Sequence, residues 1–222
     1  MLSGSIWPPV YKLIKQGWVM KVIKQSIVVI MMSLVCTSGW AFSLERYVEG
    51  VHYQKVDNTK HTPNTVVEFF SFGCPHCYHL EPKVEKWLQT KPEAVQFSRV
   101  PATWNASFRK LGKLYYVIEK LGLQDKAMPL VFDYVHGQKK TVDGPKSAFE
   151  ALSSLEVTEA AVTEAWNDTE VETKTNTAGR TFSQYQLRGV PAFMVNGQYT
   201  TSVKMAGSEE ELFEVVNFLL GK

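Results

Sequence analysis

The sequence predicts an α/β fold in which a helical insertion separates the two halves of a β-sheet domain. Three patterns lead to this prediction: a β-α-β order over residues 66–100, a series of helical patterns over residues 102–187, and a β-β-α order after them. The chain has 222 residues, of which 45% are hydrophobic and 12% aromatic, so it can bury a core without disulfide or metal staples.

The first half of the sheet domain begins with residues 66–71, a short run of β-branched and aromatic residues that is typical of a buried strand. Residues 74–89 follow with apolar side chains at helical spacing, and Pro82 is expected to bend this helix without ending it. Residues 95–100 then alternate as a second strand. Because one helix joins the two strands, we expect them to pair in parallel with a right-handed crossover.

The insertion consists of helical patterns with no strand pattern between them. They cover residues 108–121, 127–134, 147–152, 158–166 and 171–185. Gly122, Gly137 and the Asp-Gly-Pro segment at 143–145 are expected to act as helix stops and turns that separate them.

The second half of the sheet domain begins with a hairpin. Residues 192–195 and 198–201 flank Asn196-Gly197, which is the strongest short hairpin signal in the chain. Ser208 and Glu211 then have the form of a capping box at the start of a final helix. The apolar face of that helix is formed by Leu212, Val215, Val216 and Leu219.

The first 41 residues have the pattern of a cleavable secretory signal peptide. They carry four lysines and no acidic residue, then the ten-residue apolar stretch 27–36, then small residues that predict cleavage after Ala41. Ten apolar residues are too few to span a bilayer, so no stable membrane span is expected. Met20, followed by two nearby lysines, would itself be an ordinary start for such a signal.

Removal of this leader changes the charge balance of the protein. It takes away four of the 24 basic residues and none of the 22 acidic ones, so the formal charge moves from +2 to −2. No basic stripe remains that would indicate nucleic-acid binding. Cys74 and Cys77 are the cysteines left, and a pair that closes so short a loop barely constrains the unfolded chain. A disulfide-stapled scaffold is therefore not expected.

The Cys-Pro-His-Cys sequence lies where the first strand gives way to the first helix, which places Cys74 at the helix start. Unpaired backbone N–H groups and the helix dipole favour an anion there. His76 favours negative charge on the Cys74 sulfur, and Pro75 fits the first helical turn. Cys77, one turn further along, should be more buried and less acidic. The pair is thus expected to have one attacking sulfur and one resolving partner.

A metal site is the first alternative for this cluster. Cys74, Cys77, His76 and His79 are close in sequence, but a structural zinc site normally takes a second ligand pair from elsewhere, and the other histidines lack that spacing. Haem attachment needs a histidine directly after the second cysteine, where Tyr78 stands. We expect no metal, and no cofactor beyond a redox-active Cys74–Cys77 disulfide.

Residues 68–78 together with Arg-Gly-Val-Pro-Ala at 188–192 resemble the DsbA family of periplasmic thiol:disulfide oxidases, and the resemblance covers residues 45–222. It implies a thioredoxin-like fold with an inserted helical domain. The segments would be the signal peptide at 1–41, the first thioredoxin-like half at 42–101, the insertion at 102–187 and the second half at 188–222.

The resemblance also assigns roles to the motif residues. It implies that Cys74 is the nucleophilic, substrate-linked cysteine and Cys77 its buried partner. It implies that Val190 and Pro191 form the cis-proline loop that lies beside the disulfide and pairs with the substrate peptide. Residue types alone leave the isomer of Pro191 open, because a proline ahead of an edge strand is compatible with either.

Glu68 lies within an otherwise apolar strand, and burial of a carboxylate is costly. From the residues alone it could face water at the strand end, whereas the resemblance implies a buried acid that assists proton movement beneath the active site. Arg99, on the neighbouring strand, is either its charge partner or a surface arginine.

Tyr78 and His79 are expected to be packing and helix-surface residues. Gly73 replaces the bulky residue of some family members, which leaves the shape of the substrate-facing surface open.

The expected function is the introduction of disulfide bonds into secreted or periplasmic proteins through a mixed disulfide at Cys74. The expected partners are unfolded secreted proteins with free cysteines and a DsbB-type, quinone-linked membrane protein that re-oxidises the pair.

A periplasmic reductase or isomerase is the first alternative function, although the roughly 25 residues between Ala41 and the first strand leave no room for a dimerisation domain. A peptide-binding chaperone with an inert cysteine pair is the second. Its groove would be lined by Phe69, Phe70, Phe72 and Trp104.

Overall fold

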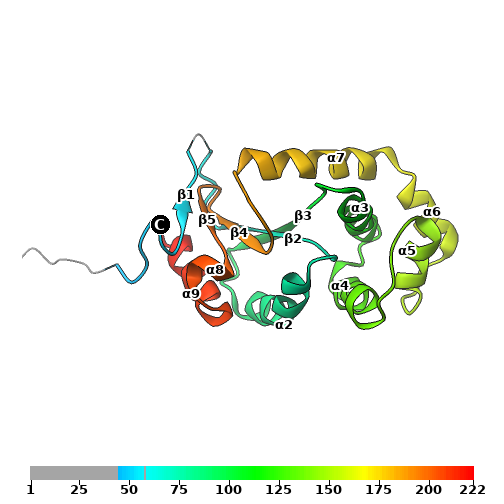
Figure 1. Cartoon of the computed structure of the whole chain (residues 1–222), viewed down its shortest axis with the longest axis horizontal. Helices are drawn as coiled ribbons and strands as arrows, with labels where there is room; N and C mark the ends of the chain where they lie inside the picture. The colour runs from blue at the N-terminus through cyan, green and yellow to red at the C-terminus, as the bar shows by residue number, and fades with distance from the viewer. Residues whose placement is uncertain (1–44, 58) are drawn as a thin grey trace, which may run out of the picture. The chain divides into compact units, whose positions relative to one another are not determined.

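The computed structural model of the chain describes residues 45–57 and 59–222 (Figure 1). The predicted signal peptide and its cleavage site lie outside the described residues. The fold contains a five-stranded sheet with the strand order β1-β5-β4-β2-β3. The strands are β1 (Gln54–Lys55), β2 (Thr65–Phe70), β3 (Gln96–Pro101), β4 (Ala192–Val195) and β5 (Tyr199–Thr201).

The central strand β2 lies between its parallel neighbour β3 and its antiparallel neighbour β4. The helix α2 (Pro75–Thr90) joins β2 to β3, which confirms the predicted β-α-β unit. α2 continues through Pro82 for a further two turns. The register places Glu68 of β2 opposite Arg99 of β3 on one side and Phe193 of β4 on the other.

Alternating residues of the sheet face two different layers of helices. On one face, Val66 and Phe193 pack with apolar residues of α2 and of α9 (Glu209–Leu220). On the other face, Phe69 and Met194 pack with Phe182 of α7 (Thr169–Gln184). Figure 1 shows α7 on the opposite side of the sheet from α2 and α9. The cysteine motif at the start of α2 is thus held at the end of a strand that is covered on both faces.

The helical insertion packs around an apolar core that continues to Phe70 and Phe72 at the end of β2. It contains α3 (Ala106–Lys120), α4 (Gln124–Phe132), the π-helical turn η2 (Asp133–Gly137), α5 (Pro145–Leu152), α6 (Glu159–Trp166) and α7. Fully buried residues of this core include Leu114, Ile118, Met128 and Leu152. Each predicted helical pattern is a helix in the structure, but the end of the 127–134 pattern, from Asp133 onward, is π-helical rather than α-helical.

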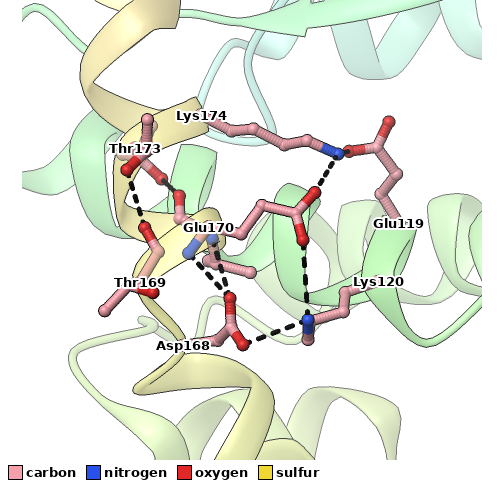
Figure 2. Close-up of polar contacts among 9 residues, drawn as sticks. Glu119, Lys120, Asp168, Thr169, Glu170, Thr173 and Lys174 are labelled. Atoms are coloured by element: carbon pink, nitrogen blue, oxygen red, sulfur yellow. Dashed lines mark hydrogen bonds and ion pairs between the residues drawn. The ribbon is translucent and has the colours of Figure 1, made fainter.

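Ion pairs connect α3 to α7 along their length. Figure 2 shows Asp168, which caps α7 by accepting hydrogen bonds from two backbone N–H groups, in contact with Lys120 of α3 at 3.1 Å. Lys174 contacts Glu119 of α3 at 3.0 Å and Glu170 of its own helix at 3.3 Å. Each such pair is worth little alone at the surface, but a network fixes the register of two helices. It therefore helps to position α7, which leads into the loop that contains Val190 and Pro191.

The C-terminal part follows the predicted hairpin and helix. Asn196 and Gly197 have φ angles of 51° and 68°, as a type I′ turn requires. Only glycine fits at position 197, because a Cβ there would lie 2.5 Å from the Lys60 carbonyl oxygen. Ser208 caps α9 by accepting a hydrogen bond from the Glu211 N–H, and the predicted apolar face of α9 is buried. No helix among the described residues is long and apolar enough to cross a membrane.

Two short elements were not predicted. The strand β1 pairs with β5 through only two residues, and α8 (Val203–Ala206) is a single turn. Neither is long enough to show a hydrophobic period in the sequence.

Candidate active site

A tight turn links β2 to α2 and sets the position of Cys74. The Gly73 N–H donates to the Ser71 hydroxyl at 3.1 Å, and the Cys74 N–H donates to the Ser71 carbonyl at 3.0 Å. Cys74 is the N-cap residue of α2, and its side chain makes no capping bond. Pro75 occupies the first helical turn, as expected. The Cys74 sulfur therefore lies at the helix N-terminus without being used to cap it.

The environment of Cys74 favours its thiolate. A hydrogen bond from the Cys77 thiol is the largest influence that lowers the Cys74 pKa, and the backbone N–H groups of Cys77 and His76 and the charge of His76 add to it. Burial acts in the opposite direction, and the net result is a pKa of about 6. Both cysteines are free thiols in this structure.

Cys77 has the opposite properties. It is 1% exposed, against 7% for Cys74, which confirms the predicted difference in burial. Burial raises the pKa of Cys77, and so do its hydrogen bond to Cys74 and the charges of Cys74 and Glu68. The two sulfurs therefore differ strongly in acidity, as the helix position predicts.

The Val-Pro loop lies against the cysteine pair. The Val190–Pro191 peptide bond is cis, which confirms the expectation from the family resemblance. The Cys74 thiol donates to the Val190 carbonyl at 3.5 Å. His76 is exposed, and it lines a groove of about 900 Å³ together with Val190 and Pro191. The structure thus brings together the predicted residues from both sequence motifs.

A buried ionic cluster lies below α2. Arg99 Nε donates to Glu68 at 2.7 Å, and Arg99 also contacts Glu81 at 2.9 Å and Glu85 at 3.4 Å. The Arg99 side chain is 7% exposed and is bonded to Glu68. Arg99 is therefore the charge partner of Glu68, and the alternative that it is a surface arginine is wrong. Glu68 itself is buried, so the interpretation in which it faces water is also wrong.

The pKa values in this cluster reflect burial and shared charge. Burial raises the pKa of Glu68 despite its bond to Arg99, and it raises the pKa of Glu81 to about 8. Burial alone would lower the Arg99 pKa, but the surrounding carboxylates outweigh it and raise that pKa. Because three carboxylates share one guanidinium, the cluster can hold a proton near neutral pH.

Glu81 was missed by the sequence reasoning. It lies four residues after Cys77 on the buried face of α2, next to Leu80. That spacing was visible in the sequence, but a carboxylate on an apolar face suggests function only once its partner Arg99 is known to be buried.

His136 is a second residue that the sequence reasoning did not place at the site. Its Nε2 lies 2.8 Å from the Phe72 carbonyl oxygen, so this nitrogen is the donor. Its ring stacks on Tyr78 with 5.0 Å between centroids and 13° between planes. The π-helical turn that contains His136 thus connects the insertion to the residues on both sides of Cys74. The prediction that His79 lies on the helix surface is confirmed, because His79 is exposed on α2.

Gly73 allows α3 to pack directly on the active-site turn. A Cβ at this position would lie 2.9 Å from Phe108 and 3.0 Å from Leu111. Phe108 therefore fills the space that a larger residue would need. The Trp104 ring contacts Phe108 in a tilted arrangement, with 5.6 Å between centroids, and Trp104 is 51% exposed. The other aromatic residues of the expected chaperone groove, Phe69, Phe70 and Phe72, are core residues with at most 1% exposure.

Three comparisons with known proteins identify the family. The DSBA-like thioredoxin domain profile matches residues 93–213, which is more than half of the chain. The thiol:disulfide interchange protein DsbA of Burkholderia cepacia is 32% identical over 155 residues, which span 70% of this chain and 73% of that protein. DsbA of Pseudomonas aeruginosa is 26% identical over 88% of this chain and 95% of its own length.

A solved structure agrees with these relatives. The crystal structure of Pseudomonas aeruginosa DsbA superposes with a TM-score of 0.74 at 27% identity, over 79% of this chain and 93% of that one. The fold, the paired cysteines and the relatives therefore lead to one conclusion. The chain belongs to the DsbA family, and it is a thiol:disulfide oxidoreductase with a thioredoxin-like fold.

Proposed function

We propose that this protein oxidises pairs of client thiols, with Cys74 as the sulfur that is attacked and Cys77 as the resolving partner. The observation that carries the proposal is the difference in acidity between the two sulfurs. Cys74 has a pKa of about 6 beside an open groove, whereas Cys77 is buried with a raised pKa.

The reaction begins with the Cys74–Cys77 disulfide. A client thiolate attacks Cys74 Sγ, a client–Cys74 disulfide forms, and Cys77 leaves with the electron pair of the broken bond. A second client thiolate then attacks the client sulfur of this mixed disulfide. The client disulfide forms, and Cys74 leaves as a thiolate. Two electrons have moved from the client to the protein, which ends as the dithiol form.

The direction of this exchange follows from the stability of the leaving thiolate. A thiol with a pKa near 6 is a good leaving group at neutral pH, so the second step favours release of the client. The same stabilisation favours the reduced protein over the oxidised one, and this makes the disulfide form an oxidant.

Glu68 is proposed to handle the proton that Cys77 needs. Cys77 leaves as a thiolate but has a raised pKa, so it takes up a proton in the reduced form. Glu68 is buried, its charge contributes to the raised Cys77 pKa, and its own pKa is raised by burial. A buried acid whose pKa is raised in this way is a candidate for proton transfer to and from the resolving sulfur. Arg99 is then a positioning residue that holds Glu68 in place.

Val190 and Pro191 are proposed to bind the client backbone. Both line the groove next to Cys74, and the Val190 carbonyl is already within reach of the Cys74 sulfur. His76 is proposed to stabilise the thiolate, and Pro75 to stiffen the loop between the cysteines.

The family supports a proposal for the cellular setting. We propose that the protein works in the periplasm after export, on unfolded secreted proteins with free cysteines. We also propose that a DsbB-type, quinone-linked membrane protein re-oxidises the pair. The names of the relatives, thiol:disulfide interchange protein DsbA, support the reaction class and leave these partners to be tested.

The test traps the mixed disulfide. In the Cys77→Ser variant, Cys74 is first coupled to a coloured aromatic thiol, and an unfolded client with a single cysteine is then added, so that no second client thiol can release the complex. We expect release of the coloured thiol and a covalent 1:1 complex that reductant dissolves. The matched Cys74→Ser variant, treated in the same way, should give no such complex. A complex formed through Cys77, or full oxidase turnover by Cys74→Ser, would contradict the proposal.

A further inference from the structure

The groove beside the cysteine pair has walls from three parts of the chain. The loop at 186–191 forms one wall, residues 200–205 with α8 form another, and Gly50, Val51 and Gln54 complete it. His76 enters it from α2. The inference below concerns which clients this groove prefers, and it rests on the proposed oxidase function.

The charged side chains that line the groove are mostly basic. Arg188 and Lys204 are exposed, and neither forms an ion pair with any residue that the structure describes. His76 lines the groove beside them. The acidic lining residue, Glu209, is paired with Lys83 of α2, and Lys83 also contacts Glu210 at 2.8 Å. Arg188 and Lys204 together still outweigh the one carboxylate charge that Lys83 leaves unbalanced, so the groove and its edge keep a net positive charge.

The same groove offers apolar contact. Val51 is 58% exposed, and Val190, Pro191 and Met205 lie on the walls. An extended peptide in this groove would meet apolar surface near the reactive sulfur and cations to its sides. The attacked form is the disulfide, in which Cys74 carries no charge that would repel an anionic peptide.

We propose that the groove selects extended client segments in which carboxylate side chains lie within a few residues of the reacting cysteine. Arg188 and Lys204 are the residues that recognise those carboxylates. Both are exposed, so they act mainly on the rate of encounter, and their effect is screened by salt. At low ionic strength we expect a preference of about 3- to 10-fold for acidic over basic segments.

The experiment compares three seven-residue peptides that contain a single cysteine. They differ only in the residues two positions before and after it, which are Glu, Gln or Lys. The second-order rate of each with the oxidised protein is divided by its rate with hydroxyethyl disulfide. This ratio removes the effect of the flanking charge on the peptide's own thiol. We expect the order Glu, Gln, Lys at about 20 mM ionic strength, and a Glu-to-Lys ratio below about 2 at 0.5 M salt.

The variants locate the source of the preference. Combined Arg188→Gln and Lys204→Gln should bring the Glu-to-Lys ratio close to one. The control Lys110→Gln, on the exposed surface of α3 and outside the groove, removes one positive charge and should leave the ratio unchanged.

The outcomes separate this inference from the proposed function. Equal normalised rates for the three peptides, faster reaction of the Lys peptide, or an unchanged ratio in the double variant would overturn the groove preference and leave the oxidase function standing. If none of the peptides reacts with the oxidised protein, the oxidase function fails and the preference with it.

Discussion

The low pKa of Cys74 predicts that the reduced protein is stabilised relative to the oxidised protein by an amount that depends on pH. The Cys74 pKa is about 6 in the folded protein, against the ordinary value of 9.0 for a cysteine thiol. A thiol whose pKa is depressed by folding adds stability that is fully present above the unfolded pKa and is lost as the pH falls through the folded pKa. The oxidised protein has no thiol at this position and lacks this contribution.

The magnitude follows from these two pKa values. At pH 5 the thiol is protonated in both the folded and unfolded states, so its contribution is close to zero. At pH 7 it is mostly ionised in the folded state only, which is worth about 1.4 kcal/mol, and at pH 8 the contribution is about 2.7 kcal/mol. For a two-electron couple, 1.4 kcal/mol makes the disulfide about 30 mV more oxidising.

The assay is urea unfolding of the reduced and oxidised protein at pH 5, 7 and 8, with a phosphine reductant for the reduced form. Other titrating groups, including Glu81, are present in both forms and largely cancel in the difference. We expect the reduced-minus-oxidised free energy of unfolding to rise by about 1.4 kcal/mol from pH 5 to pH 7. Reduced Cys74→Ser should lose this rise relative to the reduced native protein. A difference that does not change with pH would refute the reasoning.

Three substitutions test the packing and the ionic cluster. Arg99→Met leaves buried carboxylates without their partner, so we expect a loss of about 3–5 kcal/mol at pH 7 that shrinks at pH 5, measured by urea unfolding. A loss that is the same at both pH values would contradict this. Gly73→Ala forces a Cβ against Phe108 and should cost about 1–2 kcal/mol, whereas Gly144→Ala, whose Cβ meets nothing within 4 Å, is the control. His136→Phe removes a hydrogen bond to the active-site turn and should cost about 1 kcal/mol, with faster amide exchange in that turn. Unchanged exchange would show that this bond does not hold the turn.

The sequence was most informative where the pattern is local. The strand β2, the helix α2 and the cap at Ser208 each follow from side chains within a few positions of one another, and all three are present. The unequal burial of Cys74 and Cys77 was predictable for the same reason, because it depends on their position in one helical turn.

The features that were missed depend on contacts between distant segments. The two residues of β1 form a strand only because β5 pairs with them. His136 contacts Phe72 of the active-site turn although 64 positions separate the two residues, and no local period in the sequence can indicate such a contact. The burial of Glu81 is compatible with folding because Arg99, on a different element, supplies the charge that a buried carboxylate needs.

The central claim is that electrons flow from client thiols into this protein because the Cys74 thiolate is stabilised. The most direct test is the equilibrium of the purified protein with mixtures of reduced and oxidised glutathione, read from the fraction of free cysteine. We predict a reduction potential at or above that of protein disulfide isomerase, about −180 mV. A value as low as that of thioredoxin, about −270 mV, would contradict the account.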